Sequence, residues 1–313
     1  MTNALQKTKF CRGISDISDS YMGFIIDQWG VLHNGEKVYD GVIDCLKELK
    51  SRKKHIIILS NSGKRSEINK DRLKKLGIGP SLYDEILTSG EMTWHGLNAQ
   101  DQGFFQNLGK KVYVISRGND STIVDGLDVE VVDDPSEANF MIISGSDAPE
   151  KNLADYEPIL KKAVRKQLTA LCANPDSLGV MGSQSIMGAG TIARRYADYG
   201  GVVHYIGKPH KPIFQECVRK LQAQDVYPGQ TIIIGDSMTH DITGGNLMNI
   251  DTCLVRTGLH AHAFKGAKDP AAVNKALDLL SKQYNNVMPK YMVGKLEWGD
   301  PLPDRKHKKR KLF

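Results

Sequence analysis

The stretch FIIDQWGVLHNG, residues 24–35, decides the fold class of this chain. Three apolar residues lead directly into Asp27, and a glycine follows at position 30. Such a pattern is typical of a buried strand that ends on a carboxylate at a loop. Trp29 stands two places after Asp27, where a second carboxylate would make immediate chemical sense. Whether this strand end belongs to an active site depends on what the rest of the chain places beside it.

Short apolar, β-branched runs recur along the chain and alternate with stretches whose apolar residues have helical spacing. The runs are GFII (23–26), HIIIL (55–59), KVYVI (111–115), FMIIS (140–144), LTALC (168–172), VVHYI (202–206), TIIIG (231–235) and DTCLV (251–255). Helical spacing is clearest at 41–52, 66–77 and 153–166. This alternation predicts an α/β fold, a parallel sheet covered by helices on both faces. Ligands of such sheets bind at the carboxyl ends of the strands.

The composition fits a globular protein without membrane spans. The chain has 313 residues, 40% of them apolar, which is enough for a large core. No run of 18 apolar residues occurs, and the N-terminal MTNALQKTKF lacks the apolar segment of a secretory signal, so we expect a cytoplasmic protein. The five cysteines lie far apart with no CxxC pair, which argues against a disulfide framework and a zinc site.

Much of the net charge of +6 lies in the last nine residues, RKHKKRKLF at 305–313. A basic run of this kind is most often a solvated, disordered end. No aromatic residue interleaves with the run before Phe313, so stacking on nucleic-acid bases is not predicted. Any binding of a polyanion would therefore rest on this tail alone.

Four of the predicted strand ends carry polar residues. These are Asp27, then Ser60, Asn61 and Ser62, then Lys208, and finally Asp236 with Asp241. Each has an ordinary explanation when taken alone, because an aspartate or serine after a strand is often a helix cap and a lysine is usually on the surface. Together they supply carboxylates for a divalent cation, a hydroxyl and an amide for phosphate oxygens, and an ammonium group for the remaining negative charge.

In this order the set resembles the haloacid dehalogenase superfamily, and within it the NagD-type class IIA. The matching segments are Asp27 with GVLHNG behind it, SNS at 60–62, ANPD at 173–176, GKP at 207–209, GDSMTHDITGG at 235–245 and LVRTG at 254–258. The resemblance implies a Rossmann-like core at residues 1–83 and 190–313, interrupted by an α/β cap of the C2 type at 84–189. The length of the middle segment and its own strand-like runs independently support an inserted domain.

The resemblance implies a nucleophile and a Mg²⁺ site. Asp27 would attack phosphorus and form an aspartyl-phosphate that water then hydrolyses. The cation would be held by the Asp27 carboxylate, the backbone carbonyl of Trp29 and Asp236, with Asp241 in the outer shell.

The resemblance also implies which residues hold the substrate. The phosphoryl oxygens would be bound by Ser60, Asn61, Ser62 and Lys208. Asn174 and Asp176, on the cap loop, would face the leaving group. The NPD sequence at 174–176 is also explained by a simple turn, which Asn before Pro and Asp after it both favour.

Trp29 is the departure from the family pattern, because the second aspartate of DxD is the general acid and base in active phosphatases of this superfamily. An indole has one N–H donor and no titratable proton, and loss of an acid–base group typically costs about 10²- to 10⁴-fold in rate. The carbonyl expected to bind metal is retained. His33, His210 and His240 are candidates to replace the acid, although histidines in such loops are more often hydrogen-bonding or capping residues. Asp176 is a further candidate.

The sequence therefore predicts a Mg²⁺-dependent phosphatase, a phosphoric monoester hydrolase, that acts on a small phosphorylated metabolite with atypical acid–base chemistry. The alternative is a catalytically impaired phosphate- or metabolite-binding protein, a pseudophosphatase. Retention of Asp27 favours the enzyme, and Trp29 favours the binding protein. Cleavage of C–P or C–halogen bonds is a weaker alternative, since no cap lysine can be assigned to the Schiff base that C–P cleavage needs. The resemblance also implies a homodimer formed through the caps.

Overall fold

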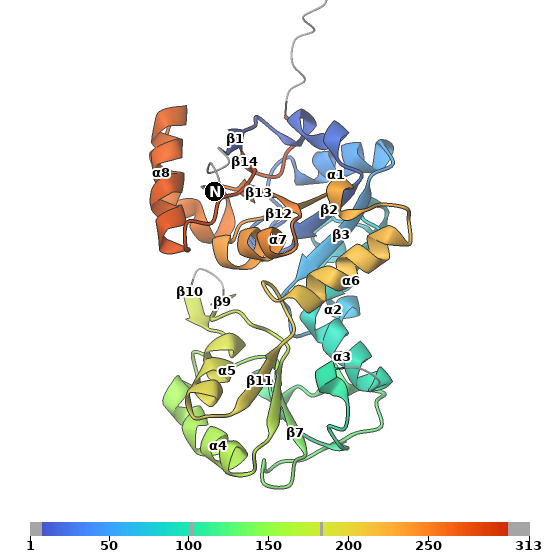
Figure 1. The fold of residues 1–313 in the computed structure, drawn as a ribbon, viewed down its shortest axis with the longest axis vertical. Coiled ribbons are helices and arrows are strands. Elements are labelled where there is room, and N and C mark those ends of the chain that lie inside the picture. The colour runs from blue at the N-terminus through green and yellow to red at the C-terminus, as the bar shows by residue number, and fades with distance from the viewer. Residues whose placement is uncertain (1–7, 101–102, 182–183, 300–313) are drawn as a thin grey trace, which may run out of the picture.

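The computed structural model describes residues 8–100, 103–181 and 184–299, which form two α/β units, one above the other in Figure 1. The basic tail at 305–313 lies outside the described residues. The larger unit, here called the core, has a seven-stranded sheet. Its strands are, in spatial order, β1 (Lys9–Phe10), β14 (Tyr291–Val293), β13 (Asp251–Val255), β12 (Thr231–Gly235), β2 (Gly23–Asp27), β3 (His55–Ser60) and β4 (Glu85–Thr88).

The smaller unit, here called the cap, has a five-stranded sheet and a hairpin. The sheet strands are β11 (Val202–Tyr205), β8 (Thr169–Cys172), β7 (Phe140–Ile143), β5 (Lys111–Ile115) and β6 (Glu130–Val131), and the hairpin strands are β9 (Leu178–Met181) and β10 (Gln184–Met187). All neighbouring strands of the two larger sheets run parallel. The predicted α/β class with parallel sheets is confirmed.

Helices cover both faces of the core sheet. The α-helices of the described residues are α1 (Val42–Ser51), α2 (Ser66–Lys75), α3 (Ser89–Ala99), α4 (Leu153–Arg165), α5 (Ala189–Asp198), α6 (Lys211–Gln222), α7 (Thr243–Leu247) and α8 (Pro270–Gln283). On β2, Phe24 and Ile26 pack into the cluster that contains α1 and α2 residues, whereas Ile25 packs into the cluster that contains α6 residues. Both faces of this central strand are thus buried, which explains its continuous apolar sequence.

The sheets divide the chain at different residues from the predicted cap limits of 84 and 189. β4 lies inside the predicted cap range but pairs with β3 of the core. β11 lies in the predicted core range but pairs with β8 of the cap, and α5 packs in the cap through Ile192 and Tyr196. Periodicity identifies a strand but not the sheet that it joins, which is why the limits differ. We propose residues 89–206 as the cap.

Two further sequence expectations concern helices and thiols. Within the described ranges, no helix combines the length and the apolar character needed to cross a lipid bilayer. All five cysteines are free thiols, and Cys45, Cys172, Cys217 and Cys253 are buried.

Candidate active site

Three neighbouring core strands bring their carboxyl ends together at the edge of the sheet that faces the cap (Figure 1). β2 pairs in parallel with β3 on one side and with β12 on the other. Asp27 and Ser60 are the last residues of β2 and β3, and Asp236 follows β12 directly. The parallel register therefore collects these three side chains, as the sequence predicted.

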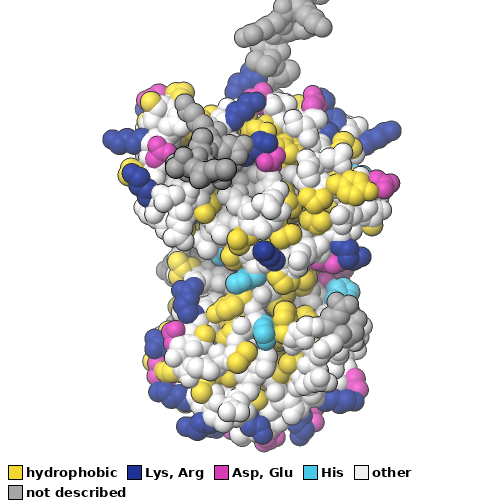
Figure 2. All heavy atoms as spheres, in the orientation of Figure 1, with side chains coloured by type: hydrophobic (Ala, Val, Ile, Leu, Met, Phe, Trp, Pro, Cys, Tyr) yellow, Lys and Arg dark blue, Asp and Glu magenta, His cyan; other side chains and the backbone are white. Residues whose placement is uncertain are grey.

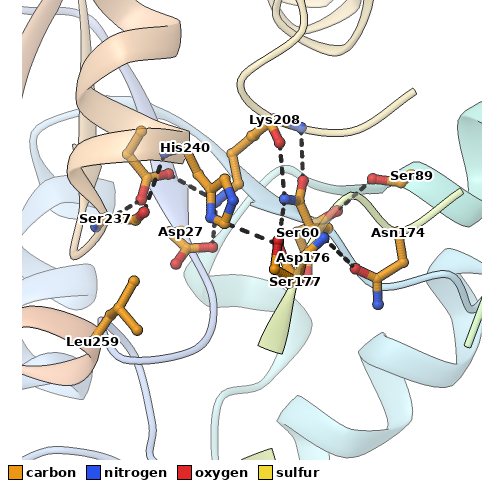
Figure 3. Close-up of polar contacts among 12 residues, drawn as sticks. Asp27, Ser60, Ser89, Asn174, Asp176, Ser177, Lys208, Ser237, His240 and Leu259 are labelled. Carbon is orange, nitrogen blue, oxygen red and sulfur yellow. Dashed lines mark hydrogen bonds and ion pairs between the residues drawn. The ribbon is translucent and has the colours of Figure 1, made fainter. Parts of the chain in front are cut away.

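Lys208 enters the same place from the linker that returns from the cap to the core. Its Nζ donates to Asp27 Oδ1 at 2.6 Å and to Asp241 Oδ1 at 2.7 Å, and its side chain is only 3% exposed. Burial by itself lowers the pKa of this lysine, but the Asp241 and Asp27 carboxylates outweigh that effect and raise the pKa above its ordinary value. Lys208 is therefore a fixed positive charge beside Asp27 (Figure 3).

Three buried carboxylates surround this lysine and form the acidic cluster of the site. One oxygen each from Asp27, Asp236 and Asp241 lie within 4.8 Å of one another. Carboxylate oxygens are ligands that Mg²⁺ prefers, so the cluster offers a chemically suitable donor set. Three carboxylates and one ammonium carry a net charge of −3 + 1 = −2 when all are ionised, which one divalent cation would neutralise.

Burial makes two of these carboxylates costly to ionise, as their pKa values show. Burial raises the pKa of Asp27 to about 7 although Lys208 opposes the shift. Burial, followed by repulsion from Asp27 and Asp241, raises the pKa of Asp236 well above its ordinary value. Carboxylates that are costly to ionise in the free protein are suited to a divalent cation, because the cation favours their charged form.

Two glycines make room for the Asp236 carboxylate. Its Oδ2 accepts a hydrogen bond from the Leu259 N–H at 2.6 Å. A Cβ would lie 2.0 Å from this oxygen if placed on Gly30, and 1.9 Å from it if placed on Gly258. Both glycines have positive φ angles, +80° and +68°. The predicted site residues did not include Gly258 and Leu259. The LVRTG segment at 254–258, which ends at Gly258, could have indicated both.

The Trp29 side chain is half-buried and packs against its own loop and α2. Its ring lies edge-on to the His33 ring, with 4.8 Å between centroids, and the Arg72 guanidinium lies 5.2 Å from the ring centroid. A Cβ placed on Gly35 would lie 2.6 Å from Trp29 Cζ3, so the indole also rests on that glycine. The indole thus has a packing role that no aspartate could fill.

The histidines that could replace the missing acid differ in their surroundings. His33 is fully buried: Nδ1 accepts from the Gly35 N–H at 3.0 Å, and Nε2 lies 3.2 Å from the Gln28 carboxamide nitrogen. Burial lowers the pKa of His33 to about 4. The His210 ring stacks on Tyr205, and burial, with His240 nearby, lowers its pKa. His33 and His210 are therefore held as neutral, packed rings.

His240 lies in the polar network of the site. Its Nδ1 is 3.6 Å from Asp176 Oδ1, and its side chain is 22% exposed (Figure 3). Histidine side chains are also visible at the narrowing between core and cap in Figure 2. Of the three candidate histidines, His240 is thus the one paired with a carboxylate from the cap.

The remaining predicted residues differ in what their side chains contact. The Asn61 carboxamide bonds to the Lys208 backbone and to Asp176 Oδ1. Asn174 Oδ1 accepts from the Asp176 N–H at 3.0 Å, which is the turn that the sequence also allowed. Ser62 Oγ accepts from the Lys64 N–H and from Asn69 Nδ2, both at 3.3 Å. The Ser62 hydroxyl is therefore engaged toward α2.

A strand-end aspartate lies beside a buried lysine and a carboxylate cluster, on a parallel α/β core that carries a cap, and this donor set suits a divalent cation. The chain belongs to the haloacid dehalogenase-like hydrolases. The sequence profile described by that name matches residues 24–130, and a HAD-hydrolase-like profile matches residues 205–280. These matches confirm the family that the motifs predicted.

Relatives with known names and structures agree with this family. Chronophin from Bos taurus is 24% identical over 90% of this chain and 92% of its own length. The 5'-nucleotidase YutF from Bacillus subtilis (strain 168) is 24% identical over 77% of this chain and 89% of its own. The crystal structure of a haloacid dehalogenase-like hydrolase from Brucella suis 1330 is 27% identical, has a TM-score of 0.75 and covers 90% of this chain and 98% of that one.

Proposed function

We propose that this chain is a Mg²⁺-dependent phosphoric monoester hydrolase that acts on a small phosphorylated metabolite through a covalent phosphate on Asp27. The observation that carries the proposal is the Asp27 carboxylate at the end of β2, held by a buried lysine inside an acidic cluster. A protein that only binds phosphate has no need of a carboxylate at the point of attack. The 5'-nucleotidase among the relatives supports phosphate esters as the substrate class.

In the proposed reaction, the residues of the chain position and stabilise the transferring phosphoryl group. Lys208 holds Asp27 through Oδ1 and supplies positive charge beside it, while Ser60 at the end of β3 supplies a hydroxyl donor. Asp27, Asp236, Asp241 and the carbonyl of Trp29 would hold Mg²⁺, with Asp241 in the outer shell. The cation, when bound, supplies neutralisation of charge on the phosphoryl oxygens.

Proton transfer to the leaving group distinguishes this site from a DxD phosphatase. Position 29 offers an indole that packs on Gly35 and His33, and His33 is a buried, neutral ring whose Nδ1 already accepts from the Gly35 N–H. With no acid at position 29, the proposed enzyme favours substrates whose leaving group departs as a stable anion, such as acyl phosphates and aryl phosphate esters. Alkyl phosphates, whose alkoxide needs a proton, are expected to react more slowly.

The experiment compares the parent with Asp27→Asn and Trp29→Asp on a panel of acetyl phosphate, p-nitrophenyl phosphate, nucleoside monophosphates and sugar phosphates, each with and without Mg²⁺. We expect Mg²⁺-dependent turnover in the parent, its loss in Asp27→Asn, and a gain in Trp29→Asp that is larger for alkyl than for aryl esters. Turnover that survives Asp27→Asn would refute the covalent mechanism.

A second function is favoured by the packing of Trp29, which replaces the acid–base group by a structural side chain. In that case the chain is a phosphate- or metabolite-binding protein that has kept the residues for binding metal and phosphate but no longer turns over a substrate. The same panel separates the two: no turnover in the parent, together with Mg²⁺-dependent phosphate binding and activity in Trp29→Asp, would establish the binding protein. Pairing of two chains through their caps stays a prediction.

A further inference from the structure

The Asn61 carboxamide joins three segments that are far apart in the sequence. Its Oδ1 accepts from the Lys208 N–H at 2.7 Å, and its Nδ2 donates to the Lys208 carbonyl at 3.1 Å and to Asp176 Oδ1 at 2.7 Å. The residue is 5% exposed. The loop after β3 is thus bonded both to the linker that carries Lys208 and to the cap loop that carries Asp176.

Close packing around Gly207 connects the same three segments. A Cβ at this position would lie 2.5 Å from Asn61 Oδ1, 2.5 Å from Ser89 Oγ and 2.6 Å from Pro175 Cδ. The linker next to Lys208 is therefore confined between the core loop and the cap loop. A displacement of Pro175 toward Gly207 would therefore press directly on the residue that precedes Lys208.

We propose that Asn61 is a positioning residue that transmits the placement of the cap loop, through Asp176, to Lys208 and its ammonium group on Asp27. The proposal rests on the proposed function, because Lys208 is the charge that holds the phosphoryl group there. Asn61 itself does not face the phosphate through its carboxamide, since both amide hydrogens and the oxygen are used within the protein. It acts on phosphate binding through Lys208.

An amide is required at this position because the site needs a donor and an acceptor on one short side chain. Aspartate keeps an acceptor for the Lys208 N–H but has no donor for the Lys208 carbonyl. It would also place a second carboxylate at the 2.7 Å contact with Asp176. Asn61→Asp therefore breaks the hydrogen-bonded connection between Lys208 and the cap loop, while the volume of the side chain changes little.

The test measures the affinity for inorganic phosphate in saturating Mg²⁺ by calorimetry, and then kcat and KM on the best ester of the panel. For Asn61→Asp we expect phosphate affinity to fall by about 10- to 100-fold. This is the usual effect of removing a residue that orients a ligand-binding side chain without touching the ligand itself. Because Lys208 also stabilises charge in the transition state, kcat should fall together with kcat/KM. Adding Asp176→Asn restores a donor across the contact and should recover part of both losses.

Asn69→Asp is the matched control. Asn69 is also a buried amide, 4% exposed, and its Nδ2 donates to Ser62 Oγ at 3.3 Å and to the Arg65 carbonyl at 3.2 Å. The same chemical change there should destabilise the fold without changing the phosphate affinity of the folded protein.

The outcomes separate this proposal from the proposed function. If the parent binds phosphate but Asn61→Asp matches Asn69→Asp, or if Asp176→Asn gives no recovery, Asn61 is a structural residue and only this proposal falls. If the parent neither binds phosphate nor turns over any ester, the proposed function falls and takes this proposal with it.

Discussion

Replacement of Gly258 by alanine should displace Asp236, a proposed metal ligand. The new Cβ would lie 1.9 Å from Asp236 Oδ2, whereas Cβ contacts under 3.0 Å essentially never occur, so the shortfall is 3.0 − 1.9 = 1.1 Å. The Gly30 Cα, at 2.6 Å, blocks relief by a shift of the backbone. The carboxylate must therefore move by about 1 Å and lose the bond from the Leu259 N–H.

Two costs follow for Gly258→Ala. An alanine at φ +68° costs roughly 1–2 kcal/mol, and loss of a hydrogen bond to a charged group costs about 1.5–3 kcal/mol. The total of roughly 2.5–5 kcal/mol should appear in urea unfolding without metal. Mg²⁺ affinity should fall by at least about 100-fold, because a ligand itself is displaced and not only its outer partner.

The decisive quantity is the increase in unfolding free energy on addition of Mg²⁺. At a concentration 100 times the parent Kd this increase is about 2.7 kcal/mol, and a 100-fold weaker site reduces it to about 0.4 kcal/mol. Gly266→Ala is the control, since Gly266 has φ +85° and nothing within 4 Å of its Cβ. This variant should lose unfolding free energy because alanine is strained at a positive φ, but it should gain as much unfolding free energy on addition of Mg²⁺ as the parent does. The same Mg²⁺ increase in both variants would refute the assignment of Asp236 as a ligand.

Two further predictions concern buried charges. Lys208→Met leaves the three carboxylates without their cation and should lower the unfolding free energy by about 3–5 kcal/mol without metal, with part regained in Mg²⁺; urea unfolding equal to the parent would contradict this. His260 is 2% exposed, accepts from the Met238 N–H, and burial lowers its pKa to about 4. Below its unfolded pKa of about 6.5 the unfolded chain gains a proton that the folded chain does not, so stability falls by about 2 kcal/mol from pH 7 to pH 5. His260→Gln should remove that part of the acid sensitivity in urea unfolding at the two pH values.

The strands that the sequence revealed are those whose residues form a short apolar, β-branched run, including β11, which is partly exposed. All eight predicted runs are strands, and 111–115, 231–235 and 251–255 have the predicted limits. The missed strands include β14, with three residues, and β1 and β6, with two each, which are too short for periodicity to stand out. The sheet that each strand joins depends on contacts between distant segments, which is why β4 and β11 were placed in the wrong unit by their position along the chain.

The site was predictable to the extent that strand ends determine it. Asp27, Ser60 and Asp236 meet because parallel strands in register end at one edge. The direction of the Asn61 side chain was not predictable, because its partners Asp176 and Lys208 lie 115 and 147 residues away. The residues around position 61 do not indicate which distant segments will pack against them in the folded chain.

Trp29 separates two requirements that a DxD motif combines. The carbonyl at this position is independent of the side chain, so a metal site can persist through any substitution that keeps the backbone. The side chain instead fixes the loop, through its contacts with His33, Gly35 and Arg72. An aspartate there would lose these contacts, so Trp29→Asp should gain proton transfer while losing stability of the loop that carries Gly30 against Asp236. The net gain in rate should therefore be smaller than the full value of an acid–base group, and greatest for the esters that need the proton most.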